Sequence, residues 1–207
     1  WSSDVCSSDL LAGLVIAMPA LVIGLELSTV GPIPPESALE GNSILYGLTK
    51  YALFGRWLPS NGVDVNLHPM AFAAWVGLLV TMINLIPIGQ LDGGHVMRAW
   101  LDDKHERISA YLHRGLIAVA AVGGVVLFLL AADAGLATLE SLGYAAVSMM
   151  PWLIWALALT GMRSLSGGEY HPPVVGPPLD RARRALAIAM IVVFILLFVP
   201  VPMRASL

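Results

Sequence analysis

Two polar side chains, Asn84 and Asp92, stand eight positions apart at the end of a long apolar run. An ionisable group at the end of a membrane helix is expensive to bury, and it marks a functional site by default. Pro87 and Gly89 lie between the two residues and a pair of glycines follows, so we expect the helix to break on both sides of Asp92. A carboxylate on unwound backbone, near an amide, could serve a metal-assisted reaction.

A plainer interpretation of these residues is also open. Asp92, Gly93 and Gly94 could form an ordinary cytoplasmic turn, and the Asn84 amide could hydrogen bond to a neighbouring helix. His95 follows the glycine pair, and we expect it to hydrogen bond to the site rather than to bind a metal.

The other histidines are expected to have ordinary roles. His105 and His113 lie in a stretch rich in Lys and Arg, where we expect them to be solvated. His171 lies in a Pro-rich loop, where a turn or docking role is expected rather than metal binding.

The elements that carry these residues are predicted to be membrane helices. Hydrophobic residues make up 57% of the chain and charged residues 12%, whereas soluble domains have about 45–50% and about 25%. Such a surplus of apolar side chains favours a lipid bilayer as the surrounding solvent. We therefore predict an all-α, polytopic membrane protein with about five transmembrane helices and one interfacial or re-entrant helix over residues 42–58. The expected spans are about 10–30, 70–88, 116–132, 145–161 and 185–201.

The distribution of positive charge predicts the orientation of these spans. Of the 11 Lys and Arg residues, 8 lie between the second and third spans or between the fourth and fifth. Because cytoplasmic loops are enriched in Lys and Arg, loops 92–115 and 162–184 are predicted to be cytoplasmic. The net charge of -3 and the lack of a basic stripe argue against a nucleic-acid partner, and a single Cys permits no disulfide within the chain.

Residues 1–10 differ abruptly from the rest of the chain. They are polar and rich in Ser, and they resemble the translation of a sequencing-library adapter. We expect this tail to be non-native, so that Cys6 has no chemical role and the natural protein extends further upstream. Residues 11–207 then form a partial membrane domain.

The block from Asn84 to His95, NLIPIGQLDGGH, resembles the second signature of the site-2 protease family of intramembrane zinc metalloproteases. That signature is Asn, then Pro three positions on, then Asp-Gly eight positions after the Asn. Asn84, Pro87, Asp92 and Gly93 satisfy it. A softer similarity to a prokaryotic subgroup extends over nearly all of residues 11–203, including His-Pro-Pro at 171–173.

The resemblance implies a function in peptide-bond hydrolysis within the membrane. It implies Zn²⁺ as the cofactor, Asp92 as the third protein ligand, and Asn84 as the group that holds the substrate or stabilises the oxyanion. Pro87, Gly93, Gly94 and His95 would support this site. The implied partners are a membrane-embedded protein substrate and the lipid bilayer, and the implied location is a prokaryotic cytoplasmic membrane.

One departure from the family pattern is important. The first signature of the family, His-Glu-x-x-His, supplies two zinc ligands and the catalytic Glu, but here the only His-Glu pair is His105-Glu106 and Ser109 stands where the second His should be. We expect that the motif lies upstream and that this fragment is inactive alone. The alternative is a non-catalytic protein, either a protease-dead homologue or a component of a transporter or channel.

Overall fold

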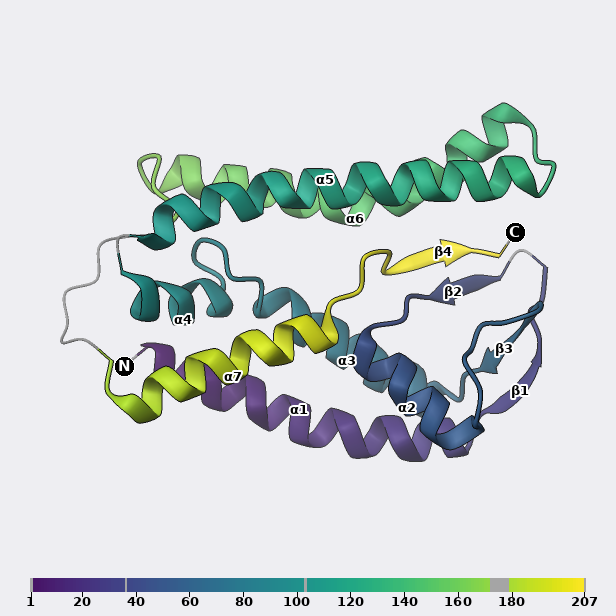
Figure 1. Ribbon diagram of the computed structural model, residues 1–207, viewed down its shortest axis with the longest axis horizontal. Helices are drawn as coiled ribbons and strands as arrows, with labels where there is room; N and C mark the ends of the chain where they lie inside the picture. Colours follow the sequence, from purple (N-terminus) through teal and green to yellow (C-terminus); the bar gives the residue numbers. More distant parts are fainter. Residues whose placement is uncertain (1, 36, 103, 172–178, 207) are drawn as a thin grey trace.

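The computed structural model describes residues 2–35, 37–102, 104–171 and 179–206, which form seven helices and four short strands (Figure 1). The helices are α1 (Ser2–Glu26), α2 (Ile44–Phe54), α3 (Pro69–Asn84), α4 (Asp92–Leu101), α5 (Lys104–Asp133), α6 (Thr138–Leu165) and α7 (Arg181–Leu197). The strands are β1 (Thr29–Pro32), β2 (Ala38–Glu40), β3 (Val63–Asn66) and β4 (Met203–Ala205). The prediction of a mostly helical protein is confirmed.

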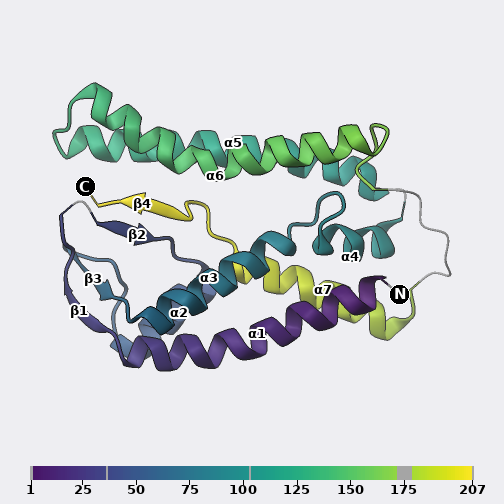
Figure 2. The ribbon, with the colours of Figure 1, turned by 180° about the vertical axis from the view of Figure 1, so that it is seen from behind.

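The long helices form two layers, as Figures 1 and 2 show from opposite sides. Helices α5 and α6 make an antiparallel hairpin, and α1, α3 and α7 make the second layer, with α4 and strands β2 and β4 between the two. The five long helices run back and forth between two ends of the molecule. One end carries α4 and the start of α7, and the other carries the strands.

Two of the described helices, α5 and α6, are long and apolar enough to cross a membrane. Residues 10–26 of α1 and helix α3 are apolar but shorter, and α7 begins with three Arg residues within its first four positions. The prediction of five crossings is therefore confirmed only in part, because two spans meet the length and composition that a bilayer requires.

The strands correct the prediction of an all-α fold. Strand β1 pairs antiparallel with β3, and β2 pairs antiparallel with β4, which joins residues 38–40 to residues 203–205. These strands are three or four residues long, so they are too short for the alternation of apolar and polar residues that identifies a strand in sequence. They lie towards one end of the molecule, with β2 and β4 between the two helical layers.

Close packing of α1 on α3 forms the centre of one layer. A Cβ atom at Gly24 would overlap the backbone of Ala71, so the absence of a side chain allows the two helices to approach closely. Leu21 and Leu25, on the same helix as Gly24, are completely buried, as is Met82 near the other end of α3.

Helix α2 lies within the range 42–58 where an interfacial or re-entrant helix was predicted. The Ser43 side chain caps its start by accepting a hydrogen bond from the Tyr46 N–H, and Gly55 ends it in the left-handed conformation, with φ 69°. Lys50 on this helix is completely buried, in contrast to the exposure expected of a lysine in an interfacial helix.

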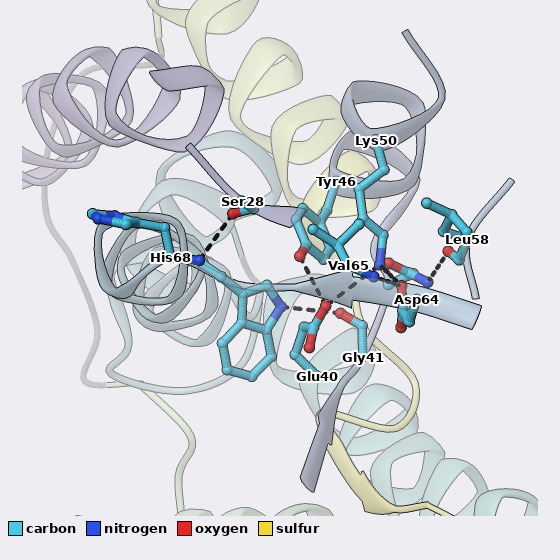
Figure 3. A network of polar contacts seen from close by, with 11 residues as sticks. Ser28, Glu40, Gly41, Tyr46, Lys50, Leu58, Asp64, Val65 and His68 are labelled. Atoms are coloured by element: carbon cyan, nitrogen blue, oxygen red, sulfur yellow. Dashed lines mark hydrogen bonds and ion pairs between the residues drawn. The ribbon is translucent and has the colours of Figure 1, made fainter. Parts of the chain in front are cut away.

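Lys50 is the centre of a polar network beneath α2 (Figure 3). Its Nζ atom lies 3.0 Å from Asp64 Oδ1 and 3.4 Å from Glu40 Oε1, and it sits 4.7 Å from the centroid of the Tyr46 ring. The Tyr46 hydroxyl donates to Glu40 Oε1 at 2.9 Å, and the Val65 N–H donates to Asp64 Oδ1 at 2.8 Å. The network ties α2, β2 and β3 together at the strand end of the molecule.

The predicted loop 92–115 is mostly helical. Helix α4 occupies its first part, and α5 begins at Lys104 instead of near residue 116. The Gly-Gly pair and the charged residues are typical of a loop, so the sequence did not predict this amphipathic helix. Its buried face includes Val96 and Met97. Helix α1 likewise includes most of the predicted tail, because it begins at Ser2.

Candidate active site

The segment between Asn84 and Asp92 is irregular and largely buried. Helix α3 ends at Asn84, and the next turn is closed by hydrogen bonds from the Leu85 N–H to Thr81 O and from the Ile86 N–H to Ile83 O. Pro87 has no N–H to donate, and the Ile88 N–H bonds back to Ile86 O at 2.8 Å. These local bonds satisfy backbone groups that would otherwise be buried without partners.

Asp92 is the first residue of α4, so the expectation that it lies on unwound backbone is wrong. Leu91 caps the helix with extended backbone but no side-chain hydrogen bond. A carboxylate at this position is stabilised by the partial positive charge of the helix N-terminus. The Asp92 side chain is half-buried, and no described residue forms a hydrogen bond or an ion pair with it.

The glycine pair allows this helix start instead of breaking the helix. A Cβ atom at Gly93 would overlap the carbonyl group of Leu85, and one at Gly94 would overlap the carbonyl group of Gly89. The first turn of α4 therefore packs directly on the backbone of the irregular segment. Gly and Gly-Gly are usual signals of a break, which is why the sequence favoured one here.

Asn84 lies at the other side of the irregular segment, as the last residue of α3. It is half-buried, and in the part of the chain that the structure describes no hydrogen bond engages its amide. The structure therefore places Asn84 and Asp92 at consecutive helix boundaries. Both present polar groups that the described part of the protein leaves without partners.

His95 and His171 meet beside the first turn of α4. His95 Nδ1 lies 2.6 Å from His171 Nε2, and the two rings form an edge-to-face pair with centroids 4.7 Å apart. One nitrogen must donate and the other accept. Burial lowers the pKa of His95, His171 lowers it further, and the charge of Asp92 opposes both effects. The charge of Asp92 thus acts on His95, whose supporting role at the site stays a prediction.

The predicted solvation of two other histidines is wrong. His105 is completely buried, and its Nε2 atom lies 3.1 Å from Ser109 Oγ. The centroid of its ring lies 5.9 Å from the centroid of the His171 ring. His113 bridges the Tyr170 hydroxyl and the Ala156 carbonyl oxygen. The charged residues around His105 and His113 led to the prediction of solvent exposure, whereas both side chains face neighbouring helices.

An apolar cavity of about 550 Å³ opens beside the irregular segment. Ile86, Pro87 and Ile88 line one part of it, Asn42 lies at another part, and helices α5 and α7 supply most of the remaining wall. The irregular backbone therefore faces a cavity, which is the setting in which such backbone is tolerated at membrane depth.

Asp92 fits a zinc site as a single ligand. Its carboxylate is unpaired and of a type that zinc accepts, whereas the nearest nitrogens of His95 and His171 face each other. Among the described residues no group of three His, Cys, Asp or Glu side chains could hold a metal ion. A tetrahedral zinc site needs more ligands than the described residues bring together.

An ionisable side chain at the boundary of an apolar helix marks a candidate functional site. Residues 60–130, which include Asn84, Asp92 and His95, match the model of Peptidase family M50. The resemblance to the site-2 protease family is confirmed over this segment. Together with the two long apolar helices, the match indicates a membrane protein.

Curated relatives support the same family. A probable zinc metalloprotease, EGY1, chloroplastic, of Arabidopsis thaliana is 31% identical over 100 residues, which cover 46% of this chain and 18% of the relative. A probable zinc metalloprotease, EGY2, chloroplastic, of Oryza sativa subsp. indica is 32% identical over 128 residues, which cover 60% of this chain and 23% of the relative. The DDT domain-containing protein PTM of Arabidopsis thaliana is 31% identical over 100 residues, which cover 46% of this chain and 6% of the relative.

The chain spans about a fifth of the length of the zinc metalloprotease relatives, 18% of one and 23% of the other. No solved structure matches the chain.

Proposed function

We propose that this chain is the part of an intramembrane zinc metalloendopeptidase that supplies the carboxylate ligand and a substrate-positioning amide. The observation that carries the proposal is the half-buried Asp92 carboxylate, which lies without a partner among the described residues at the start of α4. The family match over residues 60–130 supports the assignment. The remaining ligands and the base would come from a His-Glu-x-x-His segment outside this sequence.

Each residue of the site has a defined task in this proposal. Zinc, when bound, would act as a Lewis acid and lower the pKa of a bound water toward about 7. Asp92 would hold the metal. The Asn84 amide would donate a hydrogen bond to the carbonyl oxygen of the scissile peptide as negative charge develops there. His95 would orient the first turn of α4.

The substrate is proposed to be an apolar, membrane-embedded segment. A helical substrate shields its amides, so it must unwind before cleavage. The apolar cavity beside Ile86, Pro87 and Ile88 supports this proposal, because it offers space next to irregular backbone at the edge of the site. The cavity walls would exclude bulk water while the peptide is bound.

A cleavage assay with the full-length protein tests the proposed function. A transmembrane peptide reporter in liposomes would be incubated with the wild type, Asp92→Asn, and Asp133→Asn. Asp133 is an exposed carboxylate at the far end of α5 and serves as the matched control. We expect Asp92→Asn to abolish cleavage and Asp133→Asn to leave it unchanged. Full cleavage by Asp92→Asn would favour a non-catalytic membrane protein.

We also propose five membrane crossings, with loops 92–115 and 162–184 in the cytoplasm. The alternating directions of α1, α3, α5, α6 and α7 support this topology. In a Cys6→Ser background, Arg181→Cys should react with a membrane-impermeant thiol reagent only from the cytoplasmic side, and Ala134→Cys only from the outside. Labelling of both from one side would contradict the topology. The prokaryotic cytoplasmic membrane stays a prediction, since the metalloprotease relatives are named chloroplastic.

A further inference from the structure

The segment that follows α6 is anchored to the α5–α6 hairpin through Tyr170. The Tyr170 N–H donates to both carboxylate oxygens of Glu106 at 3.0 Å. The guanidinium group of Arg163 lies 4.6 Å from the centroid of the Tyr170 ring. Tyr170 itself is buried. A charge-assisted backbone bond and a cation–π contact thus fix this residue to both helices of the hairpin.

The hydroxyl of Tyr170 adds a third anchor through His113. The His113 Nε2 atom lies 2.8 Å from the Ala156 carbonyl oxygen, and a carbonyl oxygen can only accept. A neutral ring would therefore carry its proton on Nε2 and accept the Tyr170 O–H on Nδ1, at 2.9 Å. This chain of bonds links the segment to α5 and α6 together.

The same segment contacts the Asp92 region at three points. The Gln90 side-chain amide donates to the Ser166 hydroxyl. A Cβ atom at Gly89, whose φ is 64°, would lie 3.4 Å from the Tyr170 carbonyl oxygen. His171 Nε2 meets His95 Nδ1 at 2.6 Å. Residues 166–171 therefore form a brace between the hairpin and the start of α4.

His95 lies three positions after Asp92 on α4, so the two side chains occupy neighbouring sites on one helical face. His95 belongs to the first turn of α4, and the glycine pair packs this turn tightly against the irregular segment.

We propose that His171 is a positioning residue, which holds the first turn of α4, and with it Asp92, through its contact with His95. This role rests on the proposed function, because it matters for catalysis only if Asp92 binds the metal. A residue that bonds directly to a metal ligand typically contributes about 10–100-fold to metal affinity. Because His171 acts on Asp92 through His95, we expect an effect at the lower end of this range.

A zinc-affinity cycle in the full-length protein tests the proposal. Zinc affinity, measured by competition with a chelator, should fall about 10-fold in His171→Ala and in His95→Ala. The double variant should also lose about 10-fold instead of about 100-fold, because both changes remove one interaction. His171→Gln, which keeps an amide near the Nε2 position, should retain affinity within about 3-fold. Additive losses, or no loss in His171→Ala, would overturn the proposal.

Two further measurements separate the possible failures. If Asp92→Ala retains zinc, the proposed function fails; if it loses zinc while His171→Ala does not, only the positioning role fails. The His95–His171 bond can also be tested in the wild type by ¹⁵N-histidine NMR of the membrane-reconstituted protein. We expect a nitrogen–nitrogen coupling across this hydrogen bond, and its absence would overturn the proposal even if the variants do not fold.

Discussion

The two ends of the helical bundle differ in how their charged side chains are paired. At the strand end, Lys50 is completely buried and pairs with Asp64 and Glu40 (Figure 3). At the other end, Asp92 and Asn84 are half-buried, and no described residue bonds to their side chains. The comparison separates polar groups that connect parts of the fold from polar groups that are available to a ligand.

The energetics of burial explain why this difference is informative. A buried charge is destabilising unless it is paired and hydrogen-bonded. Lys50 meets that condition through Glu40 and Asp64, although Asp64 Oδ2 is buried without a hydrogen bond among the described residues. Asp92 is only half-buried, so its carboxylate does not need a protein partner and stays accessible to a ligand.

Removal of the buried cation should have the largest effect on stability. Lys50→Ala leaves the carboxylates of Asp64 and Glu40 buried without their partner, so we expect a loss of about 3–5 kcal/mol in the free energy of unfolding. Denaturant titration in detergent micelles measures it. Lys104→Ala, at an exposed position, should change stability by less than about 0.5 kcal/mol. Equal effects would remove the distinction between the two ends.

A smaller loss is expected from Tyr46→Phe. Burial, followed by the nearby charge of Glu40, raises the pKa of Tyr46, so its hydroxyl remains a donor to Glu40. Loss of a hydrogen bond to a charged group costs about 1.5–3 kcal/mol. Tyr111→Phe is the matched control, since Tyr111 is exposed. A neutral Tyr46→Phe would show that this hydrogen bond contributes little to the network.

At the site end, Gly94→Ala should be destabilising by about 1–3 kcal/mol, because its methyl group would overlap the Gly89 carbonyl. The same change at Gly143, inside α6 with open space around it, should stabilise the protein by about 0.5–1 kcal/mol. Thermal unfolding of both variants provides the comparison. Stabilisation by Gly94→Ala would contradict the tight packing of α4 on the irregular segment.

The smallest effect concerns pH. Burial lowers the pKa of His95 below its usual value of about 6.5, so protonation favours the unfolded state. The stability contributed by neutral His95 is present above about pH 6.5 and is lost as the pH falls through the lowered native pKa. Unfolding curves between pH 7 and pH 5 should show a decline that is shallower in His95→Gln. An identical decline in both proteins would exclude this contribution.

The sequence predicted those features that depend on local patterns. The apolar runs predicted the five long helices. Pro87 and its neighbours predicted the end of α3 near Asn84. The start of α4 was missed because Gly93 and Gly94 indicate a break in sequence, whereas here they allow close approach of two backbones. That role depends on a tertiary contact with no local signal.

The His95–His171 pair was missed for a related reason. The two residues are 76 positions apart and meet only because the α5–α6 hairpin returns the chain to α4. The short strands could not be predicted either, because each is defined by pairing with a distant segment, as residues 38–40 pair with residues 203–205. Family resemblance, by contrast, required only the spacing of Asn84, Pro87 and Asp92, and it was confirmed.

The most direct test of the central claim is the zinc content of the full-length protein. Wild-type and Asp92→Ala proteins, purified side by side in detergent, would be analysed by mass spectrometry for bound metal and by thermal unfolding for integrity. We expect about one zinc per wild-type molecule and almost none in a folded Asp92→Ala protein. Equal zinc in both folded proteins would contradict the assignment of Asp92 as a metal ligand.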